Sequence, residues 1–168
     1  MATGTGPFLV TAPAAAASLP SEAPQTVSWD VAGTNAAPIS TANVKITLST
    51  DGGASFPYVL AAAAPNTGSA SVALPSVVTS QARIKVEAVG NVYFDVSHGD
   101  FSIRLYGDAN GDGVIDCTDV ALVRGKLGKR TGQAGYDAMA DVNGDGVIDV
   151  RDLTVVSRHL PSGTTCSN

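Results

Sequence analysis

Apolar and polar residues alternate along much of the first 105 residues. The segment Val44–Ser49 places Val, Ile and Leu on one side of an extended chain and Lys, Thr and Ser on the other. The same alternation or short apolar runs appear at 27–31, 57–61, 71–74, 82–88, 92–96 and 101–105. Turn signals such as Asp51-Gly52-Gly53 separate them. About seven short strands with one buried face predict an antiparallel β-sandwich of roughly 100 residues.

A different periodicity begins after residue 106. The apolar residues Val120, Val123 and Leu127 in one segment, and Leu153, Val156 and Leu160 in another, have the i, i+3, i+7 spacing of a short helix. Gly128 and Pro161 follow the two stripes, and both residue types stop helices. The connector segment Gln133–Met139 predicts one additional short helix.

An internal repeat precedes the two helical stripes. The segment Asp108-Ala-Asn-Gly-Asp-Gly-Val-Ile-Asp recurs 33 residues later as Asp141-Val-Asn-Gly-Asp-Gly-Val-Ile-Asp. A twelve-residue calcium loop needs oxygen ligands at positions 1, 3, 5, 7, 9 and 12 and a glycine at position 6. These ligand positions hold Asp108, Asn110, Asp112, Val114, Asp116 and Asp119 in loop one, and Asp141, Asn143, Asp145, Val147, Asp149 and Asp152 in loop two. Position 7 binds through its backbone carbonyl, and the apolar position 8, Ile115 and Ile148, is expected to pair the two loops.

The distribution of charge favours a divalent cation over a polyanion as ligand. The chain has 15 acidic and 10 basic residues, a net charge of −5, and eight of the acids lie in the two loops. Crowded carboxylates oppose folding unless a cation lies among them. We therefore expect two Ca²⁺ ions, with binding coupled to the folding of 106–168. Without a basic patch, nucleic acid is not an expected partner.

Targeting signals and catalytic motifs are not evident in the sequence. Without a run of about 18 apolar residues, membrane insertion is not expected. The start Met1–Gly4 lacks the features of a signal peptide, which indicates a cytosolic protein or a piece of a longer one. Calcium loops favour a secreted, extracellular or cell-surface location. Since no His-Glu-x-x-His occurs and the grouping around His98 is typical of a turn, we expect no catalytic activity from this chain.

The repeated loop and helix resemble the type I dockerin module over about 106–162. The resemblance implies a small three-helix module in which two Ca²⁺ hold paired loop–helix units in near two-fold symmetry. It also implies docking to a cohesin domain on a scaffold or cell-surface protein. The family's partner surface, at loop positions 10 and 11 and later helix positions, corresponds here to Cys117, Thr118, Arg124, Lys129, Val150, Arg151 and Arg158. The alternative for Arg124 and Arg158 is a solvated helix face.

The first half resembles a second family. The segments 27–34, 48–57, 82–90 and 94–97 are similar to the Ig-like β-sandwich that follows the catalytic domain of secreted bacterial metallopeptidases. The resemblance covers roughly 7–105 and implies an accessory domain. Trp29 is expected to be a core residue, with a ligand platform as the alternative.

The two cysteines, Cys117 and Cys166, are candidates for a disulfide. If the two repeats pack antiparallel, the chain after Pro161 returns toward the first loop, and Cys166 can reach Cys117. In an extracellular setting we expect the disulfide rather than free thiols.

Together these observations predict two domains, an all-β Ig-like sandwich at 1–105 and an all-α dockerin at 106–168. The expected function is tethering of a secreted hydrolase, with a peptidase favoured, to a cohesin partner. The sandwich would then be a spacer, and the unbound chain a monomer. One alternative is a calcium-stabilised C-terminal cap without a partner. Another is carbohydrate or surface adhesion through Tyr58, Tyr93 and Phe94 of the sandwich.

Overall fold

The computed structural model describes residues 6–166. The segment Met1–Gly4, and the expected domain ends at 1 and 168, lie outside the described residues. The chain divides into two compact units. Unit one contains the described part of Met1–Leu19 together with Pro24–Pro75 and Thr79–Ile103, and unit two contains Pro20–Ala23, Ser76–Val78 and the described part of Arg104–Asn168.

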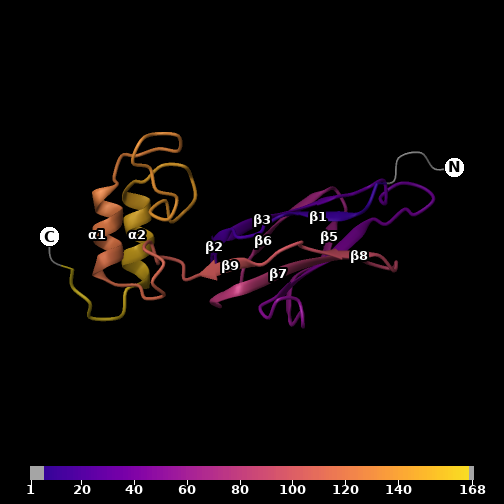
Figure 1. Cartoon of the computed structure of the whole chain (residues 1–168), viewed down its shortest axis with the longest axis horizontal. Coiled ribbons are helices and arrows are strands. Elements are labelled where there is room, and N and C mark those ends of the chain that lie inside the picture. Colours follow the sequence, from indigo (N-terminus) through magenta and orange to yellow (C-terminus); the bar gives the residue numbers. More distant parts are fainter. Residues whose placement is uncertain (1–5, 167–168) are drawn as a thin grey trace. The chain divides into compact units, whose positions relative to one another are not determined.

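Strands β1 to β9 form two sheets (Figure 1). Their bounds are β1 Leu9–Ala12, β2 Ser18–Pro20, β3 Pro24–Asp30, β4 Asn43–Ser49, β5 Tyr58–Pro65, β6 Ser69–Ala73, β7 Thr79–Ala88, β8 Phe94–Val96 and β9 Phe101–Arg104. One sheet has the order β1-β3-β6, and the other has the order β2-β9-β7-β4-β5, with β8 pairing to β7. The pairs of β3 with β1 and β6, and of β7 with β4, β8 and β9, are antiparallel.

The core of unit one draws apolar residues from both sheets. Val27 and Trp29 of β3 are buried, and so are Ile46 of β4 and Ile84 and Val86 of β7. Each pair of buried residues on one strand is two positions apart, which is the period of a strand with one covered face. The sandwich and the seven predicted strand regions are thus confirmed. Strands β1 and β2 were not predicted, because they lie in an Ala- and Pro-rich stretch without clear alternation.

Trp29 is a core residue of unit one. Its side chain is 3% exposed, and its indole Nε1–H donates a hydrogen bond of 2.9 Å to Oδ1 of Asn66. The buried Asn66 amide in turn donates to the hydroxyl of Thr34 at 3.0 Å. An indole with its polar atom satisfied inside the core is not available as a ligand platform, so the core prediction is confirmed.

Unit two contains two helices, α1 (Cys117–Gly125) and α2 (Val150–His159). Asp116 caps α1 and accepts a hydrogen bond from the backbone N–H of Thr118, and Asp149 caps α2 in the same way. Both helices have a capping box, completed by the side chains at loop position 12. The ends of the acidic loops therefore act as the helix starts. Leu127, expected within the first stripe, lies beyond the end of α1 and is 42% exposed.

The predicted third helix, at Gln133–Met139, is wrong. This segment forms successive turns, with Tyr136 N–H donating to Gln133 and Ala140 N–H donating to Asp137. Gly132 and Gly135 both have positive φ, +85° and +80°, which a right-handed helix does not accommodate. The described part of unit two accordingly has two helices instead of the three that the dockerin resemblance implied.

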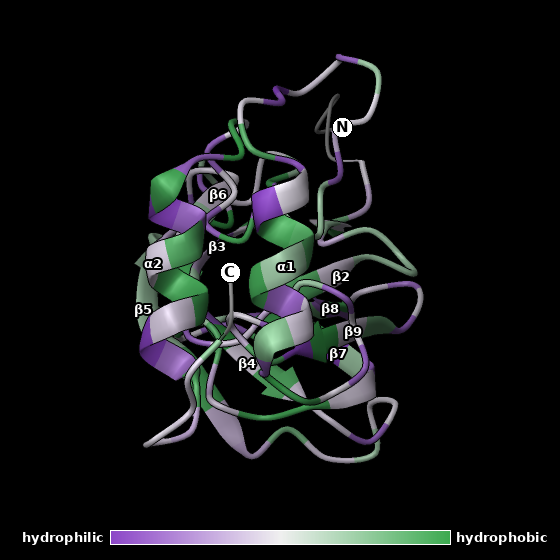
Figure 2. Cartoon of the chain, turned by 90° about the vertical axis from the view of Figure 1, so that its left-hand side faces the viewer, coloured by the Kyte–Doolittle hydropathy of each residue, from purple (hydrophilic) through white to green (hydrophobic). Residues whose placement is uncertain are grey.

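The two helices of unit two run antiparallel. A Cβ built on Gly107 would lie 3.3 Å from Cδ1 of Ile115 and 3.4 Å from Cβ of His159, so the start of α1 lies beside the end of α2. Conversely, Gly128, just after α1, donates its N–H to the carbonyl of Ile148, just before α2, at 2.8 Å. Figure 2 shows the two helices side by side, each with apolar and polar residues.

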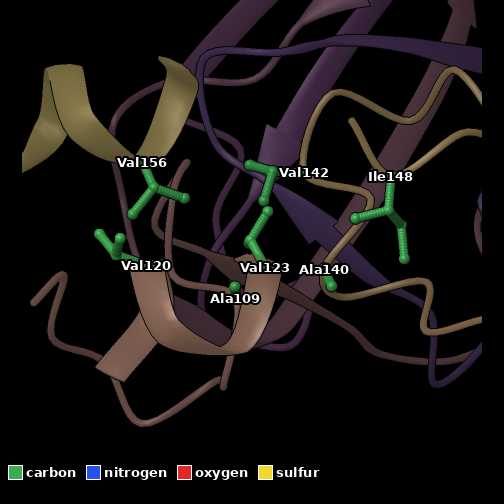
Figure 3. Packing of buried hydrophobic residues seen from close by; sticks show 7 residues of the cluster. All are labelled: Ala109, Val120, Val123, Ala140, Val142, Ile148 and Val156. Carbon is green, nitrogen blue, oxygen red and sulfur yellow. The ribbon is translucent and has the colours of Figure 1, made fainter. Parts of the chain in front are cut away.

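A small apolar core joins the helices to the second loop. Figure 3 shows Val120 and Val123 of α1 and Val156 of α2 packed near Val142 and Ile148. Ala109 and Ala140 complete this buried cluster. Because the cluster includes residues of both loops, folding of the loops and packing of the helices depend on each other.

Candidate metal centre and helix surface

In each loop, the carboxylate at position 1 accepts hydrogen bonds from backbone N–H groups of the same loop. Gly113 N–H donates to Oδ2 of Asp108 at 3.0 Å, and Gly146 N–H donates to Oδ2 of Asp141 at 2.8 Å. These two glycines occupy position 6 with φ of +87° and +85°. A side chain is disfavoured at this backbone conformation, which explains the glycine in both copies.

The other ligand positions also have matching contacts in the two loops. At position 3 the Asn Oδ1 accepts the N–H of position 5, and at position 5 the Asp Oδ1 accepts the N–H of position 7. The distances are 2.9 and 2.8 Å in loop one and 2.8 and 3.0 Å in loop two. At position 12, Oδ1 of Asp119 and Oδ1 of Asp152 each accept the N–H of position 3 at 3.0 Å. The two loops therefore have the same local conformation.

The first and last carboxylates of each loop are buried. Asp108, Asp119, Asp141 and Asp152 are all less than 5% exposed. Burial raises the pKa of Asp152, and the nearby charges of Asp141 and Asp145 raise it further, while hydrogen bonds from the backbone lower it. Paired acidic groups removed from water favour a cation among them.

The donor set fits a hard divalent cation. Each loop offers carboxylate oxygens, an Asn oxygen and a position-7 carbonyl, which are the ligand types of Ca²⁺. Within residues 6–166, no group of three or more His, Cys, Asp or Glu side chains is arranged to hold a metal ion. The side-chain oxygens are instead engaged by backbone N–H groups, as the hydrogen bonds above show. A carboxylate oxygen has two lone pairs, so these bonds restrict the side chains without consuming all their acceptor capacity.

The two loops differ in the groups that surround them. In loop two, the Tyr136 hydroxyl donates to Oδ2 of Asp141 at 2.7 Å, and Arg151 forms an ion pair of 3.2 Å with Asp145. In loop one, the buried Arg104 guanidinium donates from Nη1 to the backbone carbonyl of Asp108 at 2.8 Å. Tyr136 and Arg104 were not predicted as loop neighbours, because both lie outside the repeated segment and no spacing connects them to the loops.

Loop two pairs with the segment that follows α1. Ile148 N–H donates to the carbonyl of Lys129 at 2.9 Å, and Thr131 N–H donates to the carbonyl of Gly146 at 3.0 Å. Ile148 is buried, whereas Ile115 is half-buried beside Gly107. Ile115 packs against the buried cluster that includes Ile148. Direct pairing of the two loops through these isoleucines stays a prediction, and the backbone of loop two also pairs with 128–131.

The predicted disulfide is present. Cys117 and Cys166 are joined, and they are separated by 49 residues in sequence. The bond connects the first residue of α1 to the segment after α2. It follows that Cys117, at position 10 of loop one, is a half-buried disulfide partner and not a free surface thiol.

The helix surfaces of the two repeats differ in composition. At position 10, Val150 of α2 is 68% exposed, whereas the equivalent Cys117 is covered in part. The remaining residues predicted for partner binding, Thr118, Arg124, Lys129, Arg151 and Arg158, are all exposed. In the described part of the chain, α2 therefore presents an exposed valine and two exposed arginines. Asp149, the N-cap, and Asp152, in the first turn, belong to the second loop and to the capping box.

The sandwich does not present the predicted aromatic residues as one exposed surface. Phe94 is 61% exposed, but Tyr58 and Tyr93 are half-buried. The Tyr93 hydroxyl accepts a hydrogen bond from the Asn66 side chain, and its ring packs edge-on against Phe8. In the described chain, no helix has the length and apolar character needed to cross a membrane.

Comparison with known families gives a match within the helical unit. Residues 106–161 match the model of the dockerin type I domain. Dockerin type I domains bind calcium in general. The match covers the two acidic loops and both helices, and it indicates a non-catalytic docking module in this part of the chain.

Two solved structures also resemble the chain. They are an N-terminal and a C-terminal interface mutant of a type II cohesin–X–dockerin complex from Acetivibrio cellulolyticus, 16% and 17% identical. Each match covers 94% of this chain and 97% of the other, with TM-scores of 0.34 and 0.35, which support no conclusion about function. A comparison with curated proteins gives no match. The resemblance to a metallopeptidase accessory domain is not supported by any of these findings.

Proposed function

We propose that this chain is a calcium-dependent docking module whose two acidic loops each bind one Ca²⁺ and whose helices bind a cohesin-type domain. The observation that carries the proposal is the pair of loops with matching hydrogen bonds, each ending in a helix cap, inside a segment that matches the dockerin type I family. The ligands are the twelve residues named from the sequence. The chain's own carboxylates bring negative charge together, and the ions supply the compensating positive charge.

Calcium is expected to pre-organise the docking surface. The position 9 and 12 carboxylates are also the caps of α1 and α2, so an ion bound in the loop restrains the helix start directly. The apolar cluster then transmits this order to the opposite helix, because Val123 and Val156 are both fully buried in it. A surface that is rigid before binding loses less entropy on association.

The partner surface consists of the exposed residues at the helix starts and along their outer faces. It comprises Cys117, Thr118, Arg124, Lys129, Val150, Arg151 and Arg158. The α2 part is the better candidate for the main contact, since Val150 is exposed whereas Cys117 is engaged in the disulfide. An exposed apolar residue with arginines on the same helix suits a partner with an apolar recess bordered by acidic groups.

The remaining parts of the proposal concern the protein to which this chain belongs. Residues 1–105 form an Ig-like spacer domain and 106–168 the dockerin, in a monomeric arrangement when unbound. The chain tethers a secreted hydrolase, with a peptidase as the favoured case, to a scaffold or cell surface. Dockerin modules occur in extracellular cellulosome components, which supports a secreted location.

Binding to immobilised cohesin domains tests the docking function. The chain should bind at least one cohesin of type I or type II in calcium, lose binding in EDTA, and regain it when calcium is restored. Calorimetry should show two bound ions per chain, and far-UV circular dichroism should show a gain of helix on calcium addition. If the calcium-loaded, folded chain binds no cohesin, the module is instead a structural cap of the C-terminus.

Substitutions on α2 locate the docking surface. Val150→Asp introduces a charge at the first residue of α2, within the exposed surface, and leaves the helix stable, because an acidic group is favourable at a helix N-terminus. We expect a loss of cohesin affinity of at least tenfold from Val150→Asp and a smaller loss from Arg158→Ala. Ser71→Ala, at an exposed position on β6 of unit one, is the control. Unchanged affinity in both test variants would exclude α2 from the interface.

A further inference from the structure

Among the described residues, the hydroxyl of Tyr136 makes a side-chain contact that distinguishes the position-1 carboxylate of loop two from that of loop one. It donates to Oδ2 of Asp141 at 2.7 Å, shorter than the 2.8 Å bond from Gly146 N–H to the same oxygen. In loop one, Asp108 accepts only backbone N–H groups among the described residues, from Gly111 and Gly113. The residue equivalent to Tyr136 is Ile103, in β9, which has no hydroxyl to donate.

We propose that Tyr136 is a positioning residue for a calcium ion in loop two, and that this makes the two calcium sites unequal. The inference rests on the proposed calcium function and adds a residue that lies outside the twelve-residue loop. With Oδ2 of Asp141 held by the hydroxyl and by Gly146, the carboxylate has a restricted orientation before any ion binds. Outer-shell groups that orient a ligand in this way change metal affinity by about 10–100-fold.

Packing around Tyr136 restricts its hydroxyl. The ring is half-buried against the apolar cluster of unit two, so the hydroxyl is held by the fold and not by a mobile surface side chain. The turn that contains it is fixed by the bonds from Tyr136 N–H to Gln133 and from Asp141 N–H to Asp137, both 3.1 Å. Because the connector forms turns instead of the predicted helix, the phenol of Tyr136 lies next to loop two.

Charged side chains near the loops add to the expected difference in calcium affinity between the two loops. Arg104, which is 8% exposed, places a guanidinium at the backbone carbonyl of Asp108, where it opposes a cation in loop one. The cation beside loop two is Arg151, which pairs with Asp145 but is 74% exposed and therefore screened by water. A buried positive charge has the larger effect, so loop two is expected to fill at the lower calcium concentration.

An NMR calcium titration of the full chain tests the proposal. Gly113 and Gly146 N–H groups donate to the position-1 carboxylates, so each amide signal reports its own loop. In the unsubstituted chain, the Gly146 signal should titrate before the Gly113 signal. In Tyr136→Phe, the midpoint for Gly146 should rise about tenfold while that of Gly113 is unchanged. Tyr106→Phe is the control, because Tyr106 also packs against the apolar cluster but contacts His159.

The outcomes separate this inference from the proposed function. If the unsubstituted chain takes up no calcium, both fail. If it binds two ions but Tyr136→Phe titrates like the unsubstituted chain, only the role of Tyr136 fails. Thermal unfolding in EDTA measures the contribution of the Tyr136 hydroxyl to the fold alone, because Tyr136→Phe removes its hydrogen bond to Asp141 also without calcium. The calcium midpoint of Gly146 then decides the positioning role. A stability loss specific to Tyr136→Phe in EDTA, with unchanged calcium midpoints, would overturn the proposal.

Discussion

Removing the disulfide between Cys117 and Cys166 should destabilise unit two strongly. The bond closes a segment that contains both helices and the second loop, with a sequence separation of 49 residues. In the chain-entropy model, a loop of this length lowers the entropy of the unfolded state by an amount worth about 4 kcal/mol. A unit of some 60 residues has a total stability of only about 3–9 kcal/mol, so the loss is a large fraction of it.

The experiment compares the unsubstituted chain with Cys117→Ser/Cys166→Ser in urea at saturating calcium. The helices lie in unit two, so the far-UV helical signal reports that unit, and Trp29, the single tryptophan, reports unit one by fluorescence. We expect the free energy of unfolding from the helical signal to fall by about 4 kcal/mol. The tryptophan transition should stay at the same urea concentration and is the internal control.

Two results would refute this reasoning. A change below about 1 kcal/mol in the helical transition would mean that the bond does not restrict the unfolded state as the entropy model requires. An equal shift of the tryptophan transition would mean that the effect is not confined to unit two. Ser157→Ala on the exposed side of α2 is the matched surface control and should change neither transition by more than about 0.5 kcal/mol.

Two further predictions concern burial and acidity. Ile148→Ala should lower the free energy of unfolding of unit two by about 3 kcal/mol in urea, and Ile115→Ala by roughly half as much. The reason is that Ile148 is fully buried, whereas Ile115 is only half-buried. Equal losses in the two variants would contradict this prediction. In unit one, hydrogen bonds from the Ser49 and Ser55 hydroxyls lower the pKa of Asp51 to about 2. Because this pKa lies below that of the unfolded chain, ionised Asp51 stabilises unit one at neutral pH, and the contribution is lost as the pH falls from about 4 towards 2. Carbon-detected NMR should show a higher pKa in Ser49→Ala than in the unsubstituted chain, and an unchanged value would refute the assigned cause.

The sequence predicted well the features that depend on short-range pattern. Period-two alternation and short apolar runs located seven of the strands, and the apolar stripes located both helices. Loop positions 9 and 12 could be assigned from spacing, and they proved to be the caps of α1 and α2, because capping uses residues within one turn of the helix start. The cysteine pairing also followed from the order of elements, since an antiparallel pair of helices returns the chain to its start.

Contacts that depend on the course of the turns beside the loops could not be predicted in this way. The bond from Tyr136 to Asp141 depends on a turn whose course follows from positive φ at Gly132 and Gly135, and a residue pattern does not report the direction of a turn. The approach of Arg104 to loop one likewise depends on how the chain leaves β9. Periodicity reports which face of an element is buried, but the neighbour that covers that face is chosen by packing of the whole unit. For this protein, sequence alone therefore determined most of the elements and the candidate ligands, and only the tertiary structure decided which side chains surround each loop.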